Sequence, residues 1–291
     1  MSKKSDWIIG GLLGSGVLVI GIAILLLIAG PVLVRNNFSS DSSGRIGLME
    51  IRGVINRSQE TVKQIIKYRE NPSVRGIVLR IESPGGAVAP TQEIFNELRK
   101  TREAGKVIVA SLGSVAASGG YYIACSADSI VANPGTITGS IGVIMDVPQV
   151  KELMEKVGVD WQVIKSGPHK DIGSFSRKMT TNEIKLLQSV VDDVYEQFVE
   201  AVTLFRPLSG QEVSQLADGR IYTGKQALSL GLVDYLGTQQ DAIALAGIMA
   251  GLSEKPSVIE QRPKTIFEIL TSNLDTITRS YSPGIVEYRY R

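Results

Sequence analysis

The strongest pattern along the chain is an apolar stretch near the N-terminus. Residues 7–34 contain no charged side chain, and at helical rise this stretch exceeds the roughly 20 residues that cross a bilayer. It is also longer than the apolar part of a cleaved signal peptide, about 7–15 residues. Lys3 and Lys4 precede it and only Arg35 closely follows it, so the positive-inside rule predicts a cytoplasmic tail over 1–6. We therefore predict a single-pass membrane protein with its remaining chain outside the cytoplasm.

Beyond this stretch, the pattern predicts a linker, a folded α/β domain and an extension. Residues 35–45 are polar and serine-rich, as in a flexible tether. From 46 to 255, apolar runs such as "GIVLRI" alternate with runs of helical periodicity such as "SQETVKQIIKYRE". Continuous apolar strands are typical of parallel sheets that are covered on both faces. We assign no role to the extension over 256–291.

Three features predict helices within this domain. Ser58 has the residue type of an N-cap, and Pro90 suits a first helical turn. Residues 180–205 carry apolar side chains three or four positions apart, which is typical of an amphipathic helix. We expect this long helix to pack against the domain or against another subunit.

Composition excludes several classes of function. The 31 basic and 29 acidic residues give a net charge of +2, and no basic run is present to follow a nucleic-acid backbone. Cys125 is the single cysteine and His169 the single histidine, so the chain can form no internal disulfide and has no zinc-ligand set. We expect a mechanism without metal or cofactor, and a buried, apolar role for Cys125.

Ser118 lies in the segment "SVAASGGYYIAC" and has two interpretations. It can cap the helix that follows, which is a common role for serine. Alternatively, it is a nucleophile, because the small residues around it let a carbonyl group approach the backbone closely. Ala116 stands where the G-x-S-x-G motif would have glycine, so the α/β-hydrolase arrangement is not indicated.

Two further segments supply candidate partners for such a nucleophile. In "RIESPGGAV" the amide of Gly86 can join that of Gly119 in an oxyanion hole, although paired glycines are also common in ordinary tight turns. The segment "KSGPHKDIGS" contains His169 and Lys170 as alternative bases. A histidine would need a carboxylate such as Asp171 or Asp128 to orient it, and a lysine would need burial to favour the neutral amine. The segment can also be simply a solvated loop.

Four segments taken together resemble the signal peptide peptidase A family: "ASLGSVAASGGYYIACSADSIVANPGTITGSIGVI", "LRIESPGGAV", "KSGPHKDIGS" and "RIYTGKQALSLGLVD". The resemblance is collinear from about Arg45 to Gly237 and fits the short members with one repeat. It implies a Clp protease/crotonase-like α/β fold and a membrane-anchored serine endopeptidase without cofactor. It also implies peptide substrates, namely remnant signal peptides and unfolded proteins, and a homo-oligomer whose sites are shared between subunits.

The resemblance implies a role for each matching residue. The matching positions are Ser118 as nucleophile, Lys170 as general base, Gly86 and Gly119 as oxyanion donors, and Ser140 as the residue that orients the lysine. His169 matches no functional position. Phe175 stands where many relatives have proline.

Three alternatives to this assignment can be stated from the sequence. The chain can be an inert membrane scaffold of the same fold, or a crotonase-like enzyme that acts on acyl-CoA. The segment "GRIYTGK" approaches a phosphate-binding loop, but Gln226 stands where that motif needs serine or threonine for Mg²⁺. We predict that this segment is a turn that leads into a helix.

Overall fold

The computed structural model describes residues 44–260 and 287–289. The predicted tail and transmembrane helix, and all but the end of the predicted linker, lie outside these residues. Within the described residues, no helix has both the length and the apolar character that a bilayer crossing requires.

The centre of the described structure is one eight-stranded sheet. Its strands are β1 (Arg45–Arg52), β2 (Val74–Ser83), β4 (Val107–Ala117), β5 (Ser129–Ala132), β6 (Ile137–Gly139), β7 (Ile221–Thr223), β8 (Tyr235–Leu236) and β9 (Ser257–Glu260). The order along the main path is β7-β6-β4-β2-β1-β9, with β5 pairing β4 and β8 pairing β5. All of these pairs are parallel except β6 with β7. A second, two-stranded sheet pairs β3 (Gly85–Ala87) with β10 (Glu287–Arg289) in antiparallel orientation.

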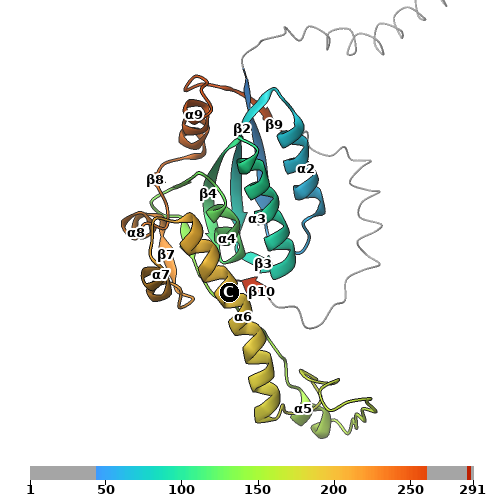
Figure 1. Ribbon diagram of the computed structural model, residues 1–291. Coiled ribbons are helices and arrows are strands. Elements are labelled where there is room, and N and C mark those ends of the chain that lie inside the picture. Colours follow the sequence, from blue (N-terminus) through green and yellow to red (C-terminus); the bar gives the residue numbers. More distant parts are fainter. Residues whose placement is uncertain (1–43, 261–286, 290–291) are drawn as a thin grey trace, which may run out of the picture. The chain divides into compact units, whose positions relative to one another are not determined.

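Helices cover both faces of the large sheet (Figure 1). They are α2 (Gln59–Glu70), α3 (Val88–Glu103), α4 (Gly119–Cys125), α5 (Lys151–Lys156), α6 (Thr181–Phe205), α7 (Gly210–Leu216), α8 (Gly224–Ser229) and α9 (Gln239–Met249). Alternate residues of β2 point to opposite faces. Ile77 and Leu79 therefore join the core that includes residues of α2, α3, α4 and α6, whereas Val78 packs with Ala242 and Ala246 of α9. The predicted mixed α/β fold is confirmed.

The register between β2 and β4 shifts close to the ends of both strands. Ile81 pairs with Leu112, but Ser83 pairs with Ala116, so β4 contains extra residues between these two pairs. Such a bulge bends a strand and redirects its end. Beyond it, β4 changes neighbour from β5 to β6 and leads directly into α4.

Some sequence expectations need adjustment. Ser58 does lie at the N-cap position of α2, but its hydroxyl makes no capping bond and instead bonds the Glu93 carboxylate. The large sheet continues past the predicted domain boundary at 255, because β9 pairs with β1. Pro90 lies in the first turn of α3, as predicted.

The predicted helix over 180–205 is present, but only part of its apolar side is covered. Thr180 caps α6 through a reciprocal bond pattern with Glu183. In the C-terminal half, Phe198 is fully buried and its ring packs edge-on against Tyr122, at a centroid distance of 5.0 Å. In the N-terminal half, Ile184 is 51% exposed. The body of the domain therefore covers only the C-terminal half of α6.

Phe198→Ala should destabilise the domain by about 3–5 kcal/mol, because it removes a fully buried ring from the main core. Leu204→Ala is the matched control, since Leu204 lies on the same helix and is 69% exposed; its effect should stay within about 0.5 kcal/mol. Urea unfolding of the full chain in detergent measures both effects. Equal effects would contradict the view that α6 is anchored through Phe198.

Candidate active site

Ser118 occupies the single residue between the end of β4 and the start of α4. Its backbone has φ 52° and ψ −120°, a region that costs a residue other than glycine about 1–3 kcal/mol. The Ser118 amide donates to the Gly139 carbonyl at 2.8 Å, and the Ser118 carbonyl accepts from the Tyr122 amide at 2.8 Å. Main-chain bonds on both sides thus hold a strained strand-to-helix turn. A nucleophile elbow also places its serine on a strained turn between a strand and a helix, but Ser118 lacks the G-x-S-x-G sequence and its Oγ is buried.

The capping interpretation of Ser118 is wrong. The residue does stand at the N-cap of α4, but its side chain makes no capping hydrogen bond. Ser118 is 1% exposed, and its Oγ is buried without a hydrogen-bond partner among the described residues. A buried hydroxyl without a partner is unfavourable and needs an explanation, one of which is a catalytic role.

The carboxylate of Glu82 stabilises the bulge that leads β4 toward Ser118. Glu82 accepts hydrogen bonds from the amides of Ser114 at 2.9 Å and Val115 at 3.1 Å. A Cβ at Gly113 would lie 1.9 Å from this carboxylate, so a side chain there would displace the Glu82 carboxylate from its present position. Sequence reasoning missed Glu82, and the available signal was one acidic residue at the end of an apolar strand.

Gly86 lies on β3 and has no room for a side chain. A Cβ there would come within 2.3 Å of the Ile55 carbonyl oxygen. Ile55 donates to the Gly85 carbonyl at 2.9 Å and accepts from the Ala87 amide at 2.8 Å. Because backbone groups alternate along a strand, the Gly86 amide points to the opposite edge of β3.

That opposite edge of β3 is the edge on which another strand pairs. Gly86 is paired with Tyr288 of β10 in antiparallel register, and Figure 1 shows β10 beside β3. The start of α4 lies close by, since a Cβ at Gly120 would be 2.9 Å from the Ser83 carbonyl. The edge of β3 near Ser118 is thus able to pair with an extended peptide.

Ser140 lies next to the turn at Ser118. It follows Gly139, which pairs with Ala117 of β4 and whose carbonyl accepts from the Ser118 amide. Ser118 and Ser140 are the two residues other than glycine with positive φ in the described part of the chain. Ser140 is 7% exposed, and its amide donates to the Arg220 carbonyl at 2.8 Å. Among the predicted site residues, the structure therefore brings Ser118, Gly119, Gly86 and Ser140 together at the carboxyl ends of β2, β4 and β6.

His169 and Lys170 lie in a different part of the chain. We call residues 144–180 the arm; they include α5 and lead into α6, and in Figure 1 they extend away from the sheet. The side chains of both His169 and Lys170 are exposed. Because the Ser118 Oγ has no partner among the described residues, neither candidate base is hydrogen-bonded to it within one chain. The base therefore stays a prediction.

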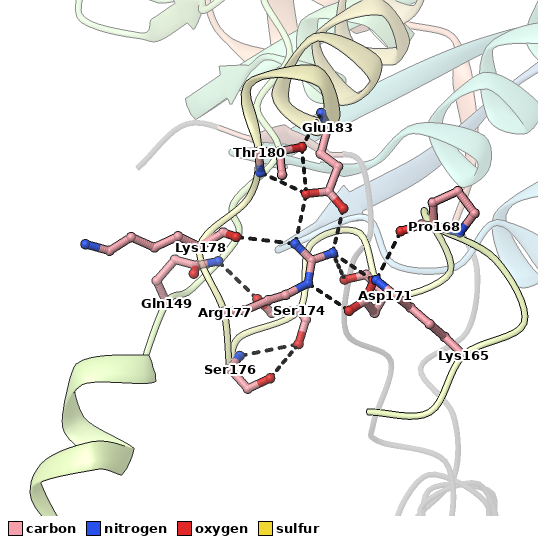
Figure 2. A network of polar contacts seen from close by, with 10 residues as sticks. All are labelled: Gln149, Lys165, Pro168, Asp171, Ser174, Ser176, Arg177, Lys178, Thr180 and Glu183. Atoms are coloured by element: carbon pink, nitrogen blue, oxygen red, sulfur yellow. Dashed lines mark hydrogen bonds and ion pairs between the residues drawn. The ribbon is translucent and has the colours of Figure 1, made fainter. Parts of the chain in front are cut away.

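The turn that carries Lys170 is held by a network of charges (Figure 2). The Arg177 guanidinium bonds both oxygens of Asp171 at 2.7 Å and also bonds the Glu183 carboxylate at 2.5 and 2.9 Å. Lys165 adds a bond to Asp171 at 2.5 Å. Hydrogen bonds from Arg177, then from Lys165, hold the pKa of the Asp171 carboxyl well below its usual range, and bonds from Arg177 and the Thr180 amide lower the pKa of Glu183 to about 2. Asp171 is thus engaged by two cations, and no bond from it to His169 is present.

The other candidate features have structural roles. Cys125 is fully buried, as predicted, and burial raises the pKa of its thiol to about 12. The segment resembling a phosphate-binding loop is the predicted turn into α8, where Thr223 and Gln226 form a capping box. The described residues contain no cluster of histidine, cysteine, aspartate or glutamate able to hold a metal ion.

Comparison with known proteins gives a consistent result. The profile of Peptidase family S49 matches residues 100–253, and the profile of Clp protease matches residues 49–134. A protein of Synechocystis sp. that is provisionally named a protease is 45% identical over 80% of this chain and 85% of its own length. A protein of Enterococcus faecium, provisionally named signal peptide peptidase SppA, is 40% identical over 64% of this chain and 54% of its own length. The chloroplastic serine protease SPPA of Arabidopsis thaliana is 33% identical over 75% of this chain but only 32% of its own length. The chain thus spans about half or less of the latter two relatives.

Gly86→Ala should destabilise the domain by about 1–3 kcal/mol, because the new methyl group meets the Ile55 backbone and forces β3 to move. Gly135→Ala is the control, since no heavy atom lies within 4 Å of a Cβ at that position. Thermal unfolding of the two variants measures the difference. If Gly86→Ala unfolds at the same temperature as Gly135→Ala, the close contact between β3 and Ile55 is not a constraint on the fold.

Proposed function

The chain belongs to peptidase family S49, and we propose that it is a membrane-anchored serine endopeptidase with a Ser118–Lys170 dyad. Membership was predicted from the sequence and is confirmed. One observation carries the proposed assignment of the nucleophile: Ser118 is held in a strained turn with its Oγ buried and without a hydrogen-bond partner among the described residues.

The proposed reaction has two halves. Neutral Lys170 takes the proton of the Ser118 hydroxyl as Oγ attacks the carbonyl carbon of a peptide bond. The amides of Gly86 and Gly119 bind the oxyanion, and Ser140 orients the lysine amine. The C–N bond then breaks, and the leaving amine takes the proton from Lys170. In the second half, Lys170 takes a proton from water as the water attacks the acyl carbon. The C–O bond to Ser118 then breaks, and Oγ takes that proton back from Lys170, which restores the neutral amine and the free serine.

The edge of β3 supports an extended peptide as the substrate. Main-chain pairing at a sheet edge binds peptides with little dependence on their sequence, and β10 already pairs with β3 in this way. A folded protein rarely offers such a free strand. We propose unfolded and membrane-derived peptides, including remnant signal peptides, as substrates. The predicted helix over 7–34 would anchor the enzyme with the protease domain outside the cytoplasm.

The exposed arm supports an oligomer in which each site is shared by two subunits. Ile164 is 96% exposed and Trp161 55% exposed. The Trp161 ring lies 5.4 Å from the ring of Phe175, which is itself 40% exposed. Contiguous exposed apolar side chains mark interaction surfaces. We propose that the arm of one subunit brings Lys170 to Ser118 of its neighbour. Desolvation there would favour the neutral amine that the reaction requires.

Ser118→Ala should abolish hydrolysis of casein and peptides, and Lys170→Ala should lower the rate by about 10²–10⁴-fold because it removes the base. His169→Ala should retain activity and serves as the matched control from the same turn. The full chain in detergent is assayed, together with labelling of Ser118 by a fluorophosphonate. Loss of activity in His169→Ala with survival of Lys170→Ala would make histidine the base. A wild-type oligomer that neither hydrolyses peptides nor reacts with the probe would support the inert scaffold.

The double variant Trp161→Glu, Ile164→Glu should dissociate the oligomer, because it places two charges on the apolar surface of the arm. Peptide hydrolysis should fall with dissociation, since Ser118 and Lys170 would no longer meet. Leu204→Glu is the control, being 69% exposed on α6 but outside the arm. Light scattering after gel filtration, with activity assayed across the fractions, tests both statements. An active wild-type monomer would contradict the shared site.

A further inference from the structure

The charge network of the arm links the turn that carries Lys170 to the start of α6. Arg177 contacts Asp171 through Nε and Nη2, and contacts Glu183 through Nη1 and Nη2 (Figure 2). Its planar guanidinium therefore bridges two carboxylates at once, which the single ammonium of a lysine cannot do in the same geometry.

One end of this bridge is a fixed point of the structure. Glu183 lies in the first turn of α6 and its side chain is 4% exposed. Its carboxylate accepts from the Thr180 amide at 2.8 Å, while its own amide donates to the Thr180 hydroxyl at 3.2 Å. This reciprocal bonding fixes the Glu183 side chain to the start of a long helix.

The other end of the bridge is the residue directly after Lys170. The Asp171 side chain is 10% exposed, and its carbonyl accepts from the Ser174 amide at 3.0 Å. The Lys170 amide donates to the Gly167 carbonyl at 3.2 Å. The backbone of Lys170 is thus part of a tight turn whose position is set by the Asp171 carboxylate.

We propose that Arg177 is a positioning residue for Lys170: by bridging Asp171 to Glu183, it fixes the turn that carries the base to the N-terminus of α6. The inference rests on the proposed function, in which Lys170 is the base. Arg177 itself touches neither substrate nor reacting atoms.

Two features separate this network from an ordinary surface ion pair. Both carboxylates are nearly covered. Removal of the arginine would leave Asp171 paired with Lys165 and Glu183 bonded to Thr180, with no cation bridging the two charges, which is unfavourable. In addition, no apolar residue of the arm is buried. The turn therefore depends on polar contacts for its position rather than on the hydrophobic core of the body.

Arg177→Met should lower kcat by on the order of 10²-fold, the usual effect of displacing a catalytic group by about 1 Å, with KM changed less than about 3-fold. Lys178→Met is the matched control. It removes the neighbouring cation, whose ion pair with Glu152 is exposed on both sides, and such pairs contribute little. Peptide hydrolysis by the full chain in detergent gives kcat and KM. Arg177→Lys keeps the charge without the two-sided bridge and should also be impaired.

A double-variant cycle distinguishes positioning from general loss of structure. If Arg177 acts through Lys170, the Arg177→Met change should not slow the residual fluorophosphonate labelling of Ser118 in a Lys170→Ala background. An equal slowing in both backgrounds would overturn the proposal, as would wild-type kcat in Arg177→Met or in Arg177→Lys.

The same series separates the inference from the function on which it rests. If Lys170→Ala keeps wild-type activity, Lys170 is not the base, and the proposed dyad and the positioning role of Arg177 both fail. Inactive Lys170→Ala beside fully active Arg177→Met would overturn the positioning role alone.

Discussion

The geometry of the site depends on the two hydrogen bonds that the Glu82 carboxylate accepts from the Ser114 and Val115 amides. In a regular parallel ladder β4 would follow β2 to its end. Instead, the extra residues of β4 form a bulge, and the amides freed from the ladder bond to a side chain of the neighbouring strand. The strand then ends at Ser118, beside the turn into β3. Ser118 and β3 are close because β2 and β4 pair again beyond the bulge, at Ser83 and Ala116.

The body and the arm of the domain are stabilised by different kinds of interaction. The body has helices on both faces of a parallel sheet and a continuous core, which favours a rigid site around Ser118 and Gly86. The arm has little core and is ordered by charges and turns. The free energy of local unfolding is lower for a segment such as the arm, with few buried apolar contacts, than for the body. The proposed nucleophile, Ser118, thus lies in the rigid part, and the candidate base lies in the part that is easier to reposition.

Much of the fold follows from local sequence patterns. The apolar run "GIVLRI" predicts a buried parallel strand, which is present as part of β2. The periodicity of residues 180–205 likewise predicts the helix α6. Other features depend on contacts between distant residues and leave no local signal. Glu82 bonds residues more than thirty positions away, and β10, at residues 287–289, pairs with β3, at residues 85–87. Likewise, the apolar periodicity of α6 does not reveal that Ile184 is left exposed.

The site shows the same division between local and distant information. Sequence reasoning identified Ser118 but left its role open between cap and nucleophile, because the residue type serves both. The backbone angle and the unpartnered hydroxyl, which only the fold defines, exclude the cap. Gly86 was predicted as an amide donor or a turn residue, and its contact with Ile55 shows that the strand leaves no space for a side chain.

The backbone of Ser118 also bears on how such a protein evolves. In the described residues, nine of the other ten positions with positive φ hold glycine, and the tenth is Ser140. Glycine adopts these angles without a steric penalty. Selection for stability alone would favour glycine at 118 as well. Retaining an L-residue there lowers the stability of the whole domain by about 1–3 kcal/mol, a sizeable part of the margin by which a typical domain stays folded. The chain therefore has less tolerance for destabilising substitutions elsewhere, and a descendant that no longer required the Ser118 side chain would be free to gain stability at this position.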